Sequence, residues 1–286
     1  MIDLRRIRYL RLGTPDLDEA TAFATQILGL EAAGREPGMA YFRSDDRDHT
    51  MCYVEGDPRE HTTAFEVSES SDLSAIGGEL DDRGYRVQRG TPAEREQRRV
   101  LDFIAFDDPS GNHIEIVWRA QHGTRRYFPG RDAGIEGFSH IGLRTTDAAR
   151  DEAFWTTVFN ARPSDWIGTA PLLRINEIHH TIALFPSAYP GVQHVNHQVA
   201  SFDDVMRAWY FVRERRGLRV VFGPGRHPSS GAQFLYFEGL DGMIYEYSHG
   251  VMIIEDEAGY VPRQFPFTAE AFCAWGAKPD IVEFQA

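Results

Sequence analysis

Two stretches of this chain share one pattern: residues 8–33, RYLRLGTPDLDEATAFATQILGLEAA, and residues 137–162, GFSHIGLRTTDAARDEAFWTTVFNAR. Each is typical of a strand, a Thr/Asp turn and an amphipathic helix, with Asp16 or Asp18 placed to cap the first helix and Asp147 the second. Repetition within one chain constrains architecture more strongly than any single segment does. The match therefore predicts two halves built on the same plan.

Two further matches extend the repeat through both halves. Residues 62–87 match residues 194–220, each as a strand followed by a helix that ends near a glycine. Residues 101–118 match residues 232–249, each as a β-hairpin around a glycine-containing turn. Each half thus holds two units of a strand, a helix and several further strands. We expect an α+β fold with curved sheets and helices on their outer faces.

A loop separates the two halves at residues 119–134, RAQHGTRRYFPGRDAG, which is rich in Gly and Arg. The chain has 286 residues, enough for two ordinary domains. We therefore expect an N-terminal domain over residues 1–125 and a C-terminal domain over residues 134–286.

Composition excludes several classes of partner. The net charge of −13 argues against a broad basic surface for nucleic-acid phosphates. Only Cys52 and Cys273 are present, which implies no disulfide framework and fits a reducing cytoplasm. The N-terminal residues lack a long apolar signal core, and no apolar run reaches membrane-spanning length. We expect a cytoplasmic protein without nucleic-acid or membrane partners.

The repeat separates residues that the fold requires from residues that only one half needs. Equivalent positions pair Tyr9 with His140, Phe65 with His197, and Glu115 with Glu246. Two imidazoles and a carboxylate on separate strands suit a divalent metal and leave open positions, as in the facial triad of non-haem Fe(II) oxygenases. Zinc is chemically compatible with the same ligands. The first half cannot bind a metal this way because phenylalanine has no ligand atom, so Glu115 is interpreted as structural or solvated.

Strand alternation selects between neighbouring histidines. His197 shares a strand face with Val195 and Val199, whereas His194 points to the other face. We therefore predict His197 as the ligand and expect His194 at the surface or outside the ligand set.

Three more groups are candidates for chemistry. His180, in EIHHTIALF, shares a face with apolar residues, so burial would lower its pKa and leave a neutral base. A buried, hydrogen-bonded histidine without function is the alternative. The C-terminal hairpin brings Tyr236 toward Glu246, with His227 upstream, although tyrosine is also simply a good strand former.

With these residues in place, the whole chain resembles the type I extradiol ring-cleaving dioxygenases of the vicinal oxygen chelate superfamily. The strongest local match is the C-terminal signature Gly225, His227, Leu235, Tyr236, Gly242 and Glu246. One departure is Gly239-Leu240, where the family usually has an acidic or small polar residue and then proline. That difference affects the shape of a turn more than the chemistry.

The resemblance implies tandem βαβββ modules, two per domain, with a non-catalytic N-terminal domain and a metal-binding C-terminal one. It implies metal ligands at His140 in FSHIGL, at His197 in VNHQVA and at Glu246. It makes His180 the acid/base group and places His227 and Tyr236 where they hydrogen-bond to the substrate. The expected reaction inserts both atoms of O2 into a catechol with Fe(II), or alternatively Mn(II), in a homo-oligomer.

The substrate stays open at this point among biphenyl-diol-like, alkylated and carboxylated catechols. Arg263 in the C-terminal tail either pairs with a substrate carboxylate or is solvated, and the tail is placed to close over the site. Three alternative functions are a glyoxalase-like isomerase, which would use more carboxylate ligands, a non-catalytic small-molecule-binding protein, and a zinc metallohydrolase.

Overall fold

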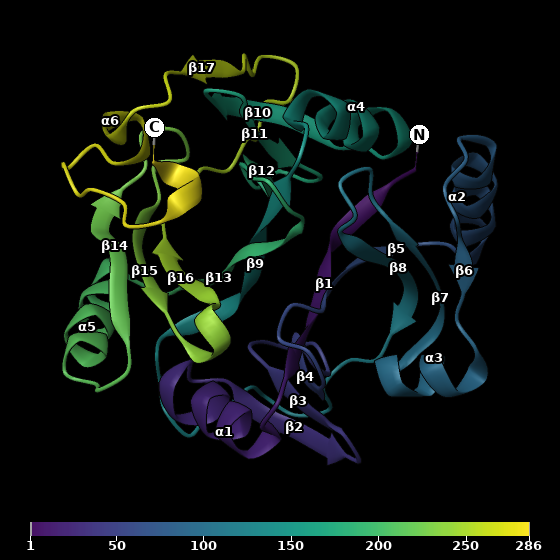
Figure 1. Cartoon of the computed structure of the whole chain (residues 1–286), viewed down its shortest axis with the longest axis horizontal. Coiled ribbons are helices and arrows are strands. Elements are labelled where there is room, and N and C mark those ends of the chain that lie inside the picture. The colour runs from purple at the N-terminus through teal and green to yellow at the C-terminus, as the bar shows by residue number, and fades with distance from the viewer. Residues whose placement is uncertain (1, 286) are drawn as a thin grey trace. The chain divides into compact units, whose positions relative to one another are not determined.

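The computed structural model of the chain describes residues 2–285 and divides by its contacts into two compact units (Figure 1). The first unit comprises residues 1–131 and 150–161, and the second comprises residues 132–149 and 162–286. This division differs from the predicted linear one at helix α4 (Ala148–Val158), most of which belongs with the first unit.

The first unit is built on an eight-stranded sheet with the order β2-β3-β4-β1-β5-β8-β7-β6. Its strands are β1 (Leu4–Thr14), β2 (Glu31–Glu36), β3 (Met39–Arg43), β4 (Met51–Glu55), β5 (His61–Val67), β6 (Gln88–Arg89), β7 (Val100–Asp107) and β8 (His113–Ala120). Its helical segments are α1 (Leu17–Ala22), which continues as the π-helix η1 (Phe23–Ile27), then α2 (Ser70–Asp82) and α3 (Pro92–Arg98).

The second unit is built on a nine-stranded sheet with the order β14-β15-β16-β13-β9-β12-β11-β10-β17. Its strands are β9 (Ile135–Thr145), β10 (Arg162–Ile167), β11 (Ala170–Arg174), β12 (Ile182–Pro186), β13 (Gly191–Val199), β14 (Arg219–Arg226), β15 (Gln233–Glu238), β16 (Ile244–His249) and β17 (Arg263–Phe265). Its helical segments are α5 (Phe202–Arg213), α6 (Ala269–Phe272) and the 3₁₀ turns η2 (Leu240–Gly242) and η3 (Val282–Phe284).

The expected α+β fold of paired βαβββ modules is confirmed. In every module the first strand pairs in parallel with the last: β1 with β4, β5 with β8, β9 with β12, and β13 with β16. The first strands of the two modules in each unit pair antiparallel, β1 with β5 and β9 with β13. Helix α5 packs against β14 and β15 (Figure 1). The first and last strands of both modules therefore lie side by side at the centre of each sheet.

Local sequence explains where several elements begin and turn. The Asp16 side chain caps α1 by accepting hydrogen bonds from the backbone N–H groups of Asp18 and Glu19, both at 2.9 Å. The predicted hairpins are formed by β7 and β8 and by β15 and β16. Their turns contain Gly111 at φ 95° and Gly242 at φ 74°, a backbone region that glycine enters without steric cost.

Helix α4 and Phe159, the residue directly after it, contribute aromatic side chains to the core of the first unit. The Trp155 ring lies 5.4 Å from that of Phe65, and the Phe159 ring stacks at 6.2 Å on that of Phe106. Trp155 and Phe159 are fully buried. Burying two such side chains accounts for the grouping of α4 with the first sheet.

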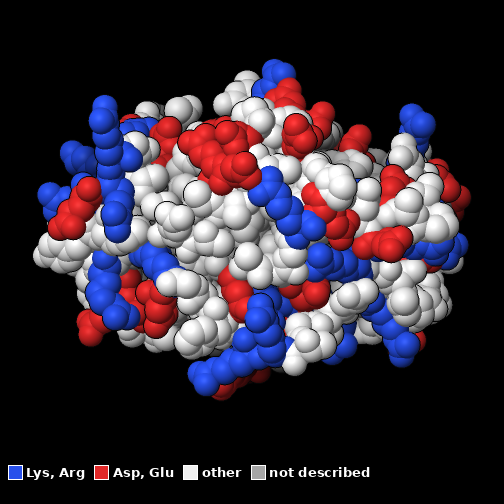
Figure 2. Space-filling view, turned by 90° about the horizontal axis from the view of Figure 1, so that it is seen from below, with Lys and Arg blue, Asp and Glu red and all other residues white. Residues whose placement is uncertain are grey.

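The surface carries both signs of charge. On the face shown in Figure 2, acidic and basic side chains are interspersed without a continuous basic region. Among residues 2–285, no helix combines the length and apolar character needed to cross a membrane.

Candidate metal centre

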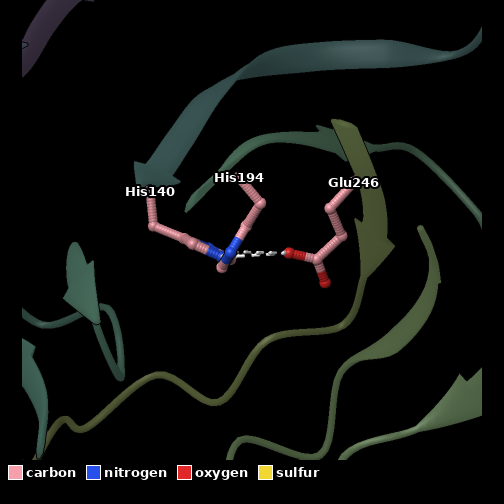
Figure 3. Close-up of side chains that lie close together, drawn as sticks. All are labelled: His140, His194 and Glu246. Atoms are coloured by element: carbon pink, nitrogen blue, oxygen red, sulfur yellow. Dashed lines mark hydrogen bonds and ion pairs between the residues drawn. The ribbon is translucent and has the colours of Figure 1, made fainter. Parts of the chain in front are cut away.

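His140, His194 and Glu246 bring their side-chain ends together in the second unit (Figure 3). Nε2 of His140 lies 3.1 Å from Nε2 of His194 and 3.0 Å from Oε2 of Glu246. Nε2 of His194 lies 3.5 Å from the same carboxylate oxygen. All three residues are buried. The structure thus gathers two imidazole nitrogens and one carboxylate oxygen around a common point.

Sheet register produces this convergence. The three residues lie on the adjacent strands β9, β13 and β16. Glu246 is paired with Asn196, and His194, two residues before Asn196, therefore shares its face of the sheet. His194 is in turn paired with Gly142, two residues after His140. All three side chains consequently project from the same face.

The prediction of His197 as the second ligand was wrong, because the structure places His194 there. His197 is paired with Tyr247, the neighbour of Glu246, and so projects from the opposite face of the sheet. Its ring lies 5.9 Å from that of Phe138. The prediction assumed that the face shared with valines points to the site. Both faces of β13 are buried, however, and the face toward the site is the polar one.

The donor set fits a divalent cation. Oε2 of Glu246 is buried and accepts no hydrogen bond from the residues described, although His140 Nε2 is only 3.0 Å away. An unsatisfied buried carboxylate oxygen is costly unless a cation compensates it. Neighbouring ligands of an octahedral ion with bonds of roughly 2.1 Å lie about 3 Å apart, close to the separations here. Two imidazoles and one carboxylate are the facial triad of non-haem iron sites.

Electrostatics keep these groups in their metal-binding protonation states. Burial alone would raise the pKa of Glu246, but the nearby imidazoles of His140, His227 and His194 outweigh it and hold the pKa well below its usual range. Burial lowers the pKa of His194 to about 3. The carboxylate is therefore ionised and His194 is neutral at neutral pH, and both offer lone pairs to a metal.

His180 lies beside this cluster as expected. Its ring centroid is 4.3 Å from that of His140. Burial lowers the pKa of His180 well below its ordinary value, and the His140 imidazole acts in the same direction. His180 is thus a neutral imidazole able to accept a proton.

His227 and Tyr236 also lie at the site. Nδ1 of His227 donates to the carbonyl of Phe272 at 2.8 Å, and its Nε2 lies 3.2 Å from the hydroxyl of Tyr236. Nε2 of His227 is also 3.6 Å from Oε1 of Glu246. Burial and the Glu246 carboxylate raise the pKa of Tyr236 well above its usual value. The phenol therefore stays protonated and can donate a hydrogen bond.

A cavity of about 20 Å³ lies against His180, His194, His227 and Tyr236. Its apolar wall consists of Ile167, Leu172, Ala183, Phe185, Phe272 and Phe284. Ser229 and Ser230 also line it, and none of the lining residues within the described range 2–285 is a lysine or arginine. The rings of Phe272 and Phe284 stack at 4.8 Å and come from the C-terminal segment. The tail thus forms part of the wall, and Phe284 is a lining residue that no motif or spacing singled out in advance.

Arg263 does not line the cavity itself, but its Nη2 donates to the backbone carbonyl of Ser229, which does, at 2.5 Å. Its Nε and Nη2 donate to Oδ1 and Oδ2 of Asp165 at 3.1 and 2.7 Å. The Asp165 carboxylate is itself fully buried and accepts from Nε2 of His179 at 2.8 Å. Arg263 therefore has an internal partner, and its side chain is also 43% exposed, as the solvated alternative expected.

The equivalent place in the first unit carries an ion pair. The hydroxyl of Tyr9 donates to Oε2 of Glu115 at 2.5 Å, and Nη2 of Arg98 donates to Oε1 at 2.7 Å. Thr62 occupies the register position that His194 holds in the second unit. Glu115 is thus structural, and a guanidinium neutralises it where the second unit offers metal ligands.

Comparisons with known proteins agree with this arrangement. A family model, the Glyoxalase/Bleomycin resistance protein/Dioxygenase superfamily, matches residues 6–116 and 137–260. An iron-dependent extradiol dioxygenase of Rhodococcus jostii (strain RHA1) is 25% identical, over 96% of this chain and 97% of its own. A biphenyl-2,3-diol 1,2-dioxygenase of Metapseudomonas furukawaii is 28% identical, over 89% of each chain. The solved Mn(II)-bound glyoxalase from Novosphingobium aromaticivorans is 25% identical, with a TM-score of 0.86 over 100% of this chain and 95% of its own.

Proposed function

The chain belongs to the glyoxalase/bleomycin resistance protein/dioxygenase superfamily and, within it, to the type I extradiol dioxygenases, and on that premise we propose that it cleaves a catechol whose ring substituent is apolar and uncharged. The observation that carries the proposal is the cluster of His140, His194 and Glu246, because its member His194 lines the same cavity as His180 and Tyr236. Such a site unites metal ligands, a neutral base and a phenolic donor.

The metal is iron, with manganese as the alternative found in one relative. His140, His194 and Glu246 would hold it. When bound, the ion supplies the one-electron chemistry that joins a catechol to O2. The protein contributes the orientation of the diol and the control of its protons.

His180 carries the proton transfers in this proposal. Because its imidazole is buried and neutral, it can accept a proton from one catechol hydroxyl and later return a proton to an oxygen atom of the opening ring.

Tyr236 and His227 orient the substrate oxygens. The protonated phenol of Tyr236 donates a hydrogen bond to a catechol oxygen. His227 donates from its Nδ1 to the carbonyl of Phe272, and its Nε2 accepts from the hydroxyl of Tyr236 until the substrate binds and the phenol proton turns to the catechol oxygen.

The cavity wall supports an apolar substituent. A carboxylated catechol would bring a charge against phenylalanine, leucine and isoleucine side chains, and the described lining residues include no lysine or arginine to pair with it. A cavity of about 20 Å³ has room for little more than a water molecule. Entry of an aromatic ring therefore requires part of this wall, to which Phe272 and Phe284 belong, to rearrange.

The test uses the protein purified without oxygen and loaded with Fe(II). Oxygen uptake and the yellow ring-opened product are measured with catechol, 3-methylcatechol, 2,3-dihydroxybiphenyl and 3,4-dihydroxyphenylacetate. The proposal expects a higher kcat/KM for the apolar substrates than for the carboxylate. The opposite order would refute the substrate class, and no uptake with any diol would refute the activity.

A second candidate function is a glyoxalase-like isomerase, which the similarity to the Mn(II)-bound glyoxalase favours. The single carboxylate among the three clustered ligands argues against it. Isomerisation of a thiol–aldehyde adduct by the Mn(II)-loaded protein in the absence of O2 would establish this alternative, because ring cleavage consumes O2.

A further inference from the structure

A chain of hydrogen bonds leads from the C-terminal segment to His180. Arg263, on β17, holds Asp165, on the neighbouring β10, through both carboxylate oxygens. Oδ2 of Asp165 lies 2.8 Å from Nε2 of His179, and Nδ1 of His179 lies 3.1 Å from Nδ1 of His180. Asp165, His179 and His180 are all buried. The chain therefore links the proposed base to a carboxylate well away from the metal ligands.

Asp165 determines which nitrogen of His179 carries a proton. An ionised carboxylate only accepts hydrogen bonds, so Nε2 of His179 must be the donor. Burial opposes ionisation of Asp165, but hydrogen bonds from His179 and Arg263 outweigh it and keep its pKa below the ordinary value. Burial also lowers the pKa of His179, although Asp165 acts in the opposite direction, so the imidazole is neutral.

His179 in turn determines the tautomer of His180. A neutral imidazole protonated at Nε2 has a lone pair at Nδ1 and can only accept there. Nδ1 of His180 faces this lone pair at 3.1 Å and must therefore carry its own proton. The opposite tautomer would set two lone pairs against each other in a buried place, which is unfavourable because neither nitrogen would have a hydrogen-bond donor. Nε2 of His180 is left as the unprotonated nitrogen.

The first unit offers an internal comparison. His49 occupies the position of His180 when the sheets are aligned by register, and Asp48 occupies that of His179. Oδ2 of Asp48 lies 3.2 Å from Nδ1 of His49. In the first unit a carboxylate thus contacts Nδ1 of the imidazole directly, whereas in the second unit His179 contacts Nδ1 of His180. In both units the imidazole is held through Nδ1, and in the second unit the carboxylate lies one residue further away.

We propose that Asp165 and His179 are positioning residues that fix His180 as the Nδ1–H tautomer, with the lone pair of Nε2 presented to the substrate hydroxyl. The proposal rests on the proposed function, because it is the catechol reaction that gives His180 a proton to accept. Neither Asp165 nor His179 touches the substrate or the clustered ligands in this assignment. They act only through His180.

The tautomer is measured directly by two-bond 1H–15N correlation spectra of 15N-histidine-labelled protein loaded with Zn(II), which is diamagnetic. His180→Gln identifies the His180 signals. The expected result is a protonated Nδ1 and an unprotonated Nε2 on His180. A proton on Nε2 instead would overturn the proposal, whatever the activity.

Asp165→Asn is the matched variant, because its amide N–H can donate to Nε2 of His179. Nδ1 of His179 would then carry the proton and donate to Nδ1 of His180. We expect Nε2–H on His180 in this variant and a fall in kcat of about 10- to 100-fold, with less change in KM. Asp165→Glu, which keeps an acceptor, should restore the wild-type tautomer and part of kcat. A fall in kcat in Asp165→Asn with the tautomer unchanged would refute the positioning role. If the expected tautomer is found in a wild-type protein that cleaves no diol, the proposed function fails and the tautomer assignment stands.

Discussion

The wild-type protein should lose about 2 kcal/mol of its free energy of unfolding between pH 7 and pH 5 through protonation of His49 in the unfolded chain. Replacing His49 with glutamine should abolish this part of the loss. His49 is buried, stacks on Tyr9 at 5.0 Å between ring centroids, and meets Tyr41 edge-on at 5.3 Å. Its Nε2 has no hydrogen-bond partner among the residues described. Such surroundings favour the neutral imidazole, and burial lowers the pKa of His49 from 6.5 to about 4 in spite of Asp48.

The sign follows from proton binding in the two states. Because the pKa is depressed in the folded protein, the unfolded chain binds the proton first as the pH falls, and stability is lost between pH 6.5 and about pH 4. At about 1.36 kcal/mol per pH unit, the full effect is about 3 kcal/mol, of which about 2 kcal/mol falls between pH 7 and pH 5. Above pH 6.5 His49 is neutral in both states, and the protein keeps this part of its free energy of unfolding.

The assay is urea unfolding followed by circular dichroism at pH 7, 6 and 5 for the wild type and His49→Gln. Lost packing lowers the free energy of unfolding of the variant at every pH, so the informative quantity is the difference in slope against pH. His113→Gln is the control, since that side chain is 42% exposed. Equal slopes for the wild type and His49→Gln would refute the argument, as would an equal loss of slope in the control.

Three further predictions concern the metal site and one helix end. His194→Ala should lose most of its bound iron, measured by elemental analysis, because one of the three clustered ligands is gone. His197→Ala should retain its iron, and the reverse pattern would contradict the assigned ligand set. Tyr236→Phe should lower kcat about 100-fold with unchanged iron content, because the donor to the substrate oxygen is lost, and an unchanged kcat would exclude that role. Thr91→Ala should lower the free energy of unfolding by about 1 kcal/mol in urea titrations, because Thr91 and Glu94 form the capping box of α3, and Thr91→Ser should be near neutral.

The fold could be predicted because its modules repeat. Three pairs of matching segments indicated the strand–helix–strand order of both halves, and sheet pairing followed that order. The grouping of α4 with the first unit could not be predicted, because it depends on contacts of Trp155 and Phe159 with Phe65 and Phe106 and not on local pattern. Periodicity identifies an apolar helix face but not the sheet that buries it.

The site was predicted in part for a related reason. His140 stands where the first half has Tyr9, and Glu246 stands where it has Glu115. The change to a histidine beside a retained carboxylate indicated metal binding, and both residues lie in the cluster. The choice of His197 over His194 failed because β13 is buried on both faces, so apolar neighbours did not mark the face toward the metal site. The link from His179 to Asp165 and on to Arg263 was not foreseen, because Asp165 meets His179 across the fold and Arg263 reaches Asp165 through the pairing of β10 with β17, which no local pattern reports.

The placement of the ligands is tested most directly by a crystal structure of the anaerobic Fe(II)-loaded protein with anomalous scattering data at the iron edge. We expect a single iron peak bonded to Nε2 of His140, Nε2 of His194 and a carboxylate oxygen of Glu246, at roughly 2.0–2.2 Å. An iron peak bonded to His197, or one located away from these three side chains, would contradict it.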